Sequence, residues 1–420
     1  MAQRTRPVLF ALILASASLL SIVAYAAPNA DSVILFIGDG MGPNQIVLGR
    51  AAGGGDPLAM ERMPYSGMVT TVSAGGEVTD SGASSTALGS GYKTENGVLG
   101  MTAAHKPRQT ILERSLKLGK SAGVISDDSL TGATPAGFMV HVPDRDLSAE
   151  IAEQEAKSGA QVMMGYGRDA FVPKTEAGKT TGHDLVGELR KKGYEVVFTR
   201  DELMAAKAPR LVGLFDEDKA PTLQEMVKEA LARLNRNDRG FFLVVEQAWP
   251  DWKEGDPSGV ALDVLALDKA VAAALDFARI RGRTLVVVTS DHETGNLQIT
   301  SPARLSALRA AKGSASQIAE HLNADRSNTT QVMAAYAGIS DLTDAEANQV
   351  KTAKDTGDAI AALMTRRVGV QWTLGHTATP VKVFASGPGG ERFTGNLDNT
   401  NIPQRIADTL GLGPLEGAQE

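Results

Sequence analysis

Ser81 is the residue whose chemistry can be read most directly from the sequence. It follows Asp80 and precedes Gly82 and Ala83, in a segment that is typical of the start of a helix. A serine hydroxyl barely ionises at neutral pH, so it becomes a nucleophile only beside a base or a metal ion. Small residues after it let an anion approach the N–H groups of the first helical turn, which favour negative charge. The segment predicts a nucleophile aimed at a phosphate; the alternative is that Ser81 or Asp80 only caps the helix.

Residues of the types that bind metal ions follow several apolar runs. Asp39 stands in a glycine turn after one such run, and Asp291 and His292 are adjacent after another. An imidazole beside a carboxylate at the end of a buried strand suits zinc. His376 lies in a Gly-His-Thr segment shortly before a further apolar run. Taken singly, each of these residues could have a purely structural role, as a carboxylate in a turn or a hydrogen-bonded histidine in a loop. Only their combination favours a metal site.

The elements that must position these residues alternate between strands and helices. Strands are predicted at Ser32 to Ile37, Ser121 to Ser126, Phe241 to Val245 and Thr284 to Thr289, and helices at Thr110 to Leu118, Thr222 to Leu234 and Ala261 to Arg279. Continuous apolar runs separated by helices predict an α/β fold with a buried, mostly parallel sheet. Because the carboxyl ends of parallel strands meet at one edge, the polar residues that follow them should converge there.

Three segments lie outside that regular alternation. Residues 1–26 have a short basic region, an apolar core and a small-residue cleavage site, so we expect a signal peptide that is cleaved, rather than a membrane anchor. Residues 27–420 then form a single domain. Gly165 to His183 is polar and reads as a surface loop, and the Ala-rich, charged segment at about 301–366 reads as a helical insertion at the surface.

Composition limits the classes of function. The formal net charge is -7, which argues against general binding of nucleic acid or of an anionic membrane. An anionic substrate must therefore be attracted by local cations. The chain has no cysteine, which excludes a thiolate nucleophile and cysteine-based zinc sites. Any metal must be bound by histidine, carboxylates and other oxygen ligands.

Five motifs in a fixed order make the chain resemble the alkaline phosphatase family. They are Phe36 to Gly42, Val78 to Ala87, Ala133 to Ala136 with Arg145 after it, Val287 to His292, and Gly375 to Thr377. The resemblance runs from Val33 to about Gly411 and implies a three-layer sandwich with a mostly parallel central sheet. It also implies a hydrolase that releases phosphate from small phosphomonoesters.

The resemblance gives a role to each matching residue. Ser81 matches the nucleophile that becomes phosphorylated, and Arg145 the guanidinium that clamps two phosphate oxygens, a task that its two parallel donors suit. The remaining matches are metal ligands: Asp39, Asp291 and His292 for the first zinc, Asp251 and His376 for the second zinc, and Asp39, Thr134 and Glu246 for magnesium. Two cations about 4 Å apart would stabilise the entering and the departing oxygen.

Two positions depart from the family pattern. The family usually has a histidine four residues after the match to Asp251, as third ligand of the second zinc, and this chain has Gly255 there. Glu254 or Asp256 could replace it with oxygen ligands, or the loop is an acidic surface segment and the site is incomplete. The family commonly has an aspartate or histidine near magnesium at the position of Gly132. Its loss should change how magnesium is held and leave the basic reaction intact.

We therefore expect a periplasmic or secreted phosphomonoesterase with no membrane anchor after cleavage, and family members are often homodimers. Two alternatives stay open from the sequence. One is a phosphodiesterase or sulfatase of the same superfamily, which the matches at Thr134, Glu246 and Arg145 disfavour. The other is an exported phosphate-binding protein without turnover, which would have no need of a serine activated by a metal. His105, His141, His183 and His321 match no metal position, and we expect structural or surface roles for them.

Overall fold

The computed structural model describes residues 30–176, 179–300 and 304–415. The predicted signal peptide, residues 1–26, lies outside the described residues. Among the helices of the described part, none combines the length and the hydropathy needed to cross a membrane.

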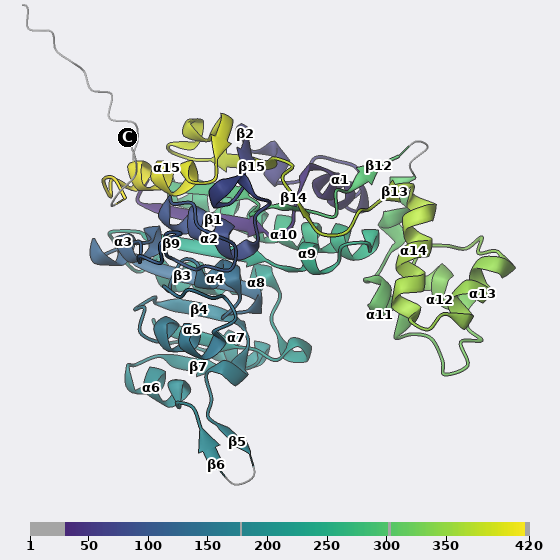
Figure 1. The fold of residues 1–420 in the computed structure, drawn as a ribbon, viewed down its shortest axis with the longest axis horizontal. Helices are drawn as coiled ribbons and strands as arrows, with labels where there is room; N and C mark the ends of the chain where they lie inside the picture. Colours follow the sequence, from purple (N-terminus) through teal and green to yellow (C-terminus); the bar gives the residue numbers. More distant parts are fainter. Residues whose placement is uncertain (1–29, 177–178, 301–303, 416–420) are drawn as a thin grey trace, which may run out of the picture.

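A sheet of ten strands forms the centre of the molecule (Figure 1). Seven of the ten, in the order β10-β1-β9-β3-β4-β8-β7, pair in parallel, and β15 joins them antiparallel to β10. The strands are β1 (Ser32–Gly38), β2 (Tyr65–Thr70), β3 (Ser121–Ser129), β4 (Val162–Tyr166), β7 (Glu195–Val197), β8 (Leu211–Leu214), β9 (Phe241–Gln247), β10 (Thr284–Thr289), β15 (Val381–Ser386) and β16 (Gly395–Asp398). The predicted α/β fold with a mostly parallel sheet is confirmed.

Helices cover both faces of this sheet, because every side chain of the central strands is buried. In β1, Ile34 and Phe36 face one apolar core and Leu35 faces the other, as the alternation of side chains along a strand requires. The first core is closed by α1 (Pro43–Ala52), α7 (Arg200–Ala205), α8 (Leu223–Leu234) and α10 (Pro257–Arg281). The second is closed by α2 (Ser81–Ser90), α3 (Ile111–Lys117), α5 (Ser148–Glu155), α6 (Leu185–Lys191) and α15 (Asn401–Leu410). The result is a three-layer sandwich.

Capping residues explain where the main helices begin. Thr110 and Thr222 each cap a helix in a capping box, so α3 and α8 start one residue after the predicted bounds. Helix α10 starts four residues before the predicted Ala261, because Asp256 accepts hydrogen bonds from the N–H groups of Ser258 and Gly259. Sequence periodicity alone did not show this cap.

The segment from Gly165 to His183 is more ordered than the predicted surface loop. It contains the end of β4, a short 3-10 turn and an antiparallel hairpin of β5 (Lys174–Glu176) and β6 (Lys179–Thr181). The hairpin projects from the body of the molecule beneath β7 (Figure 1). The sequence pattern did not predict it, because Lys174 to Thr181 lacks the alternation of apolar and polar residues that indicates a strand.

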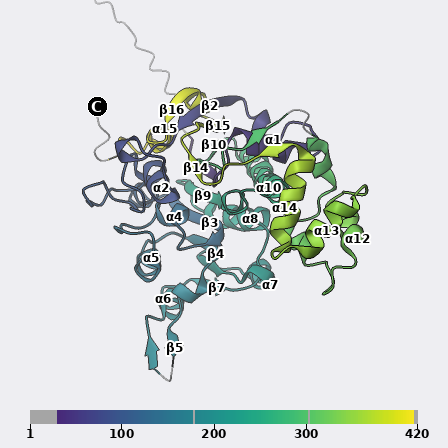
Figure 2. The same cartoon turned by 45° about the vertical axis from the view of Figure 1, so that its right-hand side comes forward.

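A group of helices lies to one side of the sheet, between the short strands β12 (Gln298–Ile299) and β13 (Val370–Gln371). Its members are α11 (Ala315–Ala319), α12 (Thr329–Tyr336), α13 (Asp344–Thr352) and α14 (Thr356–Val368). Helix α14 contacts α10, and the two lie next to each other in Figure 2. We call these four helices the side group.

Candidate active site

The predicted site residues follow the carboxyl ends of neighbouring strands. Asp39 follows β1, Glu246 is the second-last residue of β9, and Asp291 with His292 follows β10. These three strands are adjacent and parallel, so their ends meet at one edge of the sheet. Ser81 reaches this edge as the first residue of α2, whose N-cap is Asp80.

A carboxylate caps α2 and also binds the predicted phosphate clamp. One oxygen of Asp80 accepts from the N–H of Ala83 at 2.8 Å, and the other accepts from Nη1 of Arg145 at 3.0 Å and from the N–H of Gly97 at 3.0 Å. The capping function that was the structural alternative for this segment therefore belongs to Asp80. Ser81 is left with its hydroxyl directed to the site.

The Ser81 hydroxyl lies beside the first group of predicted metal ligands. Its Oγ is 3.3 Å from Nε2 of His292, and the same nitrogen is 3.3 Å from Oδ1 of Asp39 and 3.2 Å from Oδ2 of Asp291. One ligand atom from each of the three ligand residues lies within 4.8 Å of the others. All three side chains are buried.

Unpaired oxygens indicate that this group fits a cation. Oδ1 of Asp39 and Oδ2 of Asp291 are buried and have no hydrogen-bond partner among the described residues. Burial, together with the charges of Asp291, Asp251 and Glu246, raises the pKa of Asp39 well above its usual range. Two carboxylate oxygens that are buried without a donor are costly unless a positive ion joins them. Carboxylate and imidazole ligands in this number suit zinc.

The predicted second zinc ligands also come together. Nε2 of His376 lies 3.6 Å from Oδ1 of Asp251, and the His376 ring stacks on His292 with centroids 3.6 Å apart. Nδ1 of His376 lies 3.0 Å from the carbonyl of Thr79, to which it can donate, leaving Nε2 free to bind a metal. Burial lowers the pKa of His376, but the hydrogen bond and charge of Asp251 outweigh it and raise the pKa to about 9.

In the described part of the chain, the loop after Asp251 adds no residue to the second group of candidate metal ligands. Gly255 has φ +85°, a left-handed conformation that favours glycine, and a Cβ there would have no atom within 4 Å. Asp256 uses its carboxylate on the N–H groups of Ser258, Gly259 and Ala315. Glu254 accepts from the N–H of Gly375 at 2.8 Å, next to His376. Neither carboxylate belongs to a group of candidate metal ligands in the described part of the chain.

The predicted magnesium ligands Asp39, Thr134 and Glu246 line one cavity. Oδ2 of Asp39 accepts from Thr134 at 3.4 Å, and Glu246 accepts a short hydrogen bond from Ser126. Burial raises the pKa of Glu246 to about 8 even though the hydroxyls of Ser126 and Thr134 act in the opposite direction. A buried oxygen-only set of this kind suits magnesium.

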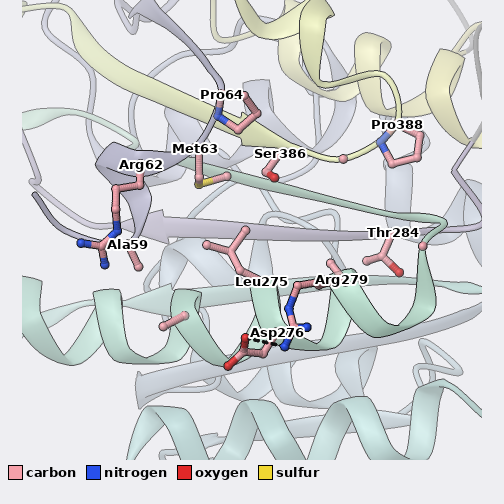
Figure 3. A pocket seen from close by; sticks show the side chains of 14 residues that line it. Ala59, Arg62, Met63, Pro64, Leu275, Asp276, Arg279, Thr284, Ser386 and Pro388 are labelled. Carbon is pink, nitrogen blue, oxygen red and sulfur yellow. Dashed lines mark hydrogen bonds and ion pairs between the residues drawn. The ribbon is translucent and has the colours of Figure 1, made fainter.

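A small cavity of about 70 Å³ joins the three groups. It is lined by Asp39, Ser81, Asp128, Gly132, Ala133, Thr134, Arg145, Glu246, Ala248, Asp251 and Trp252. A larger groove of about 610 Å³ lies at the start of β10, the opposite end of that strand from Asp291, and contains none of the predicted site residues (Figure 3). We therefore place the chemistry in the small cavity.

Sequence reasoning missed four residues that contact or line the site. Thr294 donates to Asp251 and lies 3.1 Å from Nδ1 of His292, so it links both ligand groups. Its position two residues after His292 was the available signal. Ser126 orients Glu246, while Asp128 and Trp252 line the cavity. Asp128 faces the same cavity as Gly132, where the family has a polar residue.

The four remaining histidines lie outside both ligand groups of the described chain. His141 hydrogen-bonds the carbonyl of Gly100 and the carboxylate of Glu113, His183 pairs with Glu153, and His321 stacks on Tyr336. His105 has φ 53° in an exposed turn.

Comparisons with known proteins show the family of the chain. The family model described as alkaline phosphatase matches residues 30–412. Alkaline phosphatase 3 of Bacillus subtilis is 31% identical over 90% of this chain and 88% of its own length, and streptomycin-6-phosphate phosphatase of Streptomyces griseus is 30% identical over 95% and 97%. A solved structure of a cold-active alkaline phosphatase from a Shewanella species has a TM-score of 0.83, with 30% identity over 90% of this chain and 99% of that one.

The resemblance inferred from five motifs is thus confirmed over nearly the whole described chain. Family membership carries with it hydrolysis of small phosphomonoesters and dependence on metal ions, and the two groups of candidate ligands are in place for the latter. The chain belongs to the alkaline phosphatase family and is an alkaline phosphatase.

Proposed function

We propose that the protein hydrolyses phosphate monoesters in two steps, through a phosphoseryl intermediate on Ser81. The observation that carries the proposal is the placement of the Ser81 hydroxyl, 3.3 Å from His292 and next to the unpaired oxygens of Asp39 and Asp291. Zinc at the two histidine-containing groups, with magnesium near Thr134 and Glu246, would lower the pKa of hydroxyl groups and neutralise phosphoryl oxygens.

In the first step, Oγ of Ser81 attacks phosphorus in line with the ester oxygen. The bond between phosphorus and the ester oxygen breaks, the alcohol leaves with a proton, and phosphate is transferred to the serine. Arg145 donates to two phosphoryl oxygens, and the N–H groups at the start of α2 face the same negative charge. In the second step, water attacks the phosphoserine and releases inorganic phosphate with the serine hydroxyl.

The N-terminal segment and the assembly are part of the same proposal. Cleavage after residue 26 would leave residues 27–420 as one catalytic domain, periplasmic or secreted, with the segment at about 301–366 as a helical insertion. A homodimer is the proposed assembly. The signal-peptide pattern of residues 1–26 supports the proposed location, and the frequent dimers of the family support the proposed assembly.

Hydrolysis of three aryl esters tests the proposal and separates it from its alternatives. Protein supplied with zinc and magnesium should hydrolyse p-nitrophenyl phosphate, fastest at alkaline pH, and a chelator should stop it. Faster turnover of bis-p-nitrophenyl phosphate or of p-nitrophenyl sulfate would favour the diesterase or sulfatase alternative. Phosphate binding without turnover of any ester would favour the binding protein.

A further inference from the structure

A second cavity, about 740 Å³ in volume, adjoins the catalytic one. Trp252 lines both cavities. At the ends of β3 and β9, successive residues divide between them: Asp127 and Gln247 face the large cavity, and Asp128 and Glu246 face the small one. The catalytic cavity has room for little beyond a phosphoryl group, so most of the alcohol of a substrate must lie outside it.

The walls of the large cavity come from two parts of the chain. Trp249 and Asp263 belong to α9 (Trp249–Trp252) and α10, while Ser316 and Asp358 belong to α11 and α14 of the side group. Asp256 ties the two parts together, because it caps α10 and also accepts from the N–H of Ala315. Figure 1 shows α11 and α14 across from α9. The side group thus encloses space next to the catalytic residues.

The charge of this cavity is strongly negative. Glu217, Glu320 and Asp358 line it, are exposed, and form no ion pair with any described residue. Among the lining residues, Lys253 is the one lysine or arginine, and Asp263 neutralises it at 2.8 Å. We call Glu217, Glu320 and Asp358 the acidic rim. A cation is attracted to this rim, whereas a neutral or anionic alcohol is not.

Aromatic rings add a second contact that selects cations. Trp252 is 67% exposed, the ring of Trp249 already has the ammonium of Lys253 5.1 Å from its centroid, and Tyr166 also lines the cavity. The face of an indole attracts ammonium groups, quaternary ones included. An exposed tryptophan beside unpaired carboxylates is therefore suited to a positively charged ligand.

A buried acceptor without a donor lines the same cavity. Gln247 is 1% exposed and donates through its amide nitrogen to Asp127, but its Oε1 has no partner among the described residues. An unpaired buried amide oxygen is costly. The ammonium N–H of an amino alcohol would supply the missing donor, which a quaternary ammonium group lacks.

We propose that this cavity binds the leaving alcohol of the substrate and that the alcohol is cationic, an amino or quaternary ammonium alcohol. The inference rests on the proposed phosphomonoesterase activity. The phosphate would occupy the small cavity, and the positive group of the alcohol would lie over Trp252 within the acidic rim. The side group then sets the choice of substrate without contacting the reacting atoms.

A pair of esters of the same shape tests the proposal. Phosphocholine and 3,3-dimethylbutyl phosphate differ in one atom, a charged nitrogen against a neutral carbon. We expect kcat/KM for phosphocholine to be at least about ten times higher, mainly through a lower KM. Equal values for the two esters would overturn the proposal. Loss of p-nitrophenyl phosphate hydrolysis as well would instead contradict the proposed function.

A second test removes negative charges from the cavity wall and compares the result with a control variant. Glu320→Gln with Asp358→Asn should reduce the ratio of kcat/KM for phosphocholine to kcat/KM for the neutral ester about fivefold or more. Asp344→Asn removes an exposed charge elsewhere on the side group, at the start of α13, and should leave the preference intact. An equal effect of both changes would show that only the general field of the protein acts.

A binding measurement decides the point even if turnover fails. Choline should quench tryptophan fluorescence saturably, 3,3-dimethylbutanol should not, and Trp252→Phe should reduce the signal. An identical response to the two alcohols would overturn the proposal.

Discussion

Asp80 accepts a hydrogen bond from Arg145 at 3.0 Å with one carboxylate oxygen and caps the helix of Ser81 with the other. The predicted phosphate clamp and the predicted nucleophile are therefore held by the same side chain. A shift of α2 would move both together, so the distance between them is preserved. Arg145 keeps further N–H groups for a phosphate, because only its Nη1 donates to Asp80.

Replacing Asp80 should therefore affect both stability and substrate binding. Asp80→Ala removes an N-cap, which costs about 1 kcal/mol of unfolding free energy, and frees Arg145, which should raise KM on the order of tenfold. Asp184→Ala is the matched control, since Asp184 caps α6 away from the site by accepting from the N–H of Gly187. Urea unfolding and steady-state kinetics measure the two effects. A similar rise of KM in both variants would contradict the link between cap and clamp.

Removal of metal should destabilise the fold as well as stop turnover. Without a cation, the unpaired oxygens of Asp39 and Asp291 remain buried close to each other and to His292. We expect a chelator to lower Tm by several degrees and zinc with magnesium to restore it. Scanning calorimetry before and after dialysis checks this, and an unchanged Tm after complete metal loss would count against these ligands.

Replacing Gly255 by the histidine that the family has there should reduce the stability of the protein. Its φ of +85° disfavours any side chain, so Gly255→Ala and Gly255→His should each lose about 1–2 kcal/mol of unfolding free energy. The open space around the missing Cβ leaves room for an imidazole, so only the histidine variant should retain more zinc on dialysis. Elemental analysis of the two variants makes the comparison. Equal zinc content would show that the loop holds position 255 away from His376.

Asp263 should make the protein lose stability as pH rises from about 4 to about 6. Burial raises the pKa of Asp263 to about 6 although the charge of Lys253 opposes the shift. The native state then binds this proton more tightly than the unfolded state, so the contribution of Asp263 is greatest below its unfolded pKa and is lost through the native pKa. The loss is roughly 2 kcal/mol. The free energy of unfolding, measured at pH 4.5 and pH 7, should fall by this amount in the parent protein and not in Asp263→Asn. An equal change with pH in the two proteins would refute the prediction.

Sequence patterns located four neighbouring strands at the centre of the ten-stranded sheet, β10, β1, β9 and β3, because these strands are continuous apolar runs. The runs at Ser32 to Ile37 and Thr284 to Thr289 differ from β1 and β10 by at most one residue. The start of α10 was missed although Asp256 followed by Pro257 is a local signal for a helix start, because the prediction rested on hydrophobic periodicity alone. The hairpin of β5 and β6 was missed because it has no apolar pattern.

Within the site, the order of motifs in the sequence predicted which candidate ligands lie together, but not their surroundings. Asp39, Asp291 and His292 are brought together from places up to 253 residues apart, which the parallel pairing of β1 and β10 explains. Whether Glu254 is near the second group could not be derived from spacing. Its contact with Gly375 depends on where two loops meet, and no local pattern encodes that.

Direct detection of phosphoserine tests the central claim most closely. Protein loaded with zinc and magnesium should be mixed with a phosphomonoester, quenched in acid within milliseconds, digested and analysed by mass spectrometry. The account predicts one added phosphate on Ser81 and none in Ser81→Ala, while both proteins retain equal metal. Phosphate on another residue, or full turnover by Ser81→Ala, would contradict it.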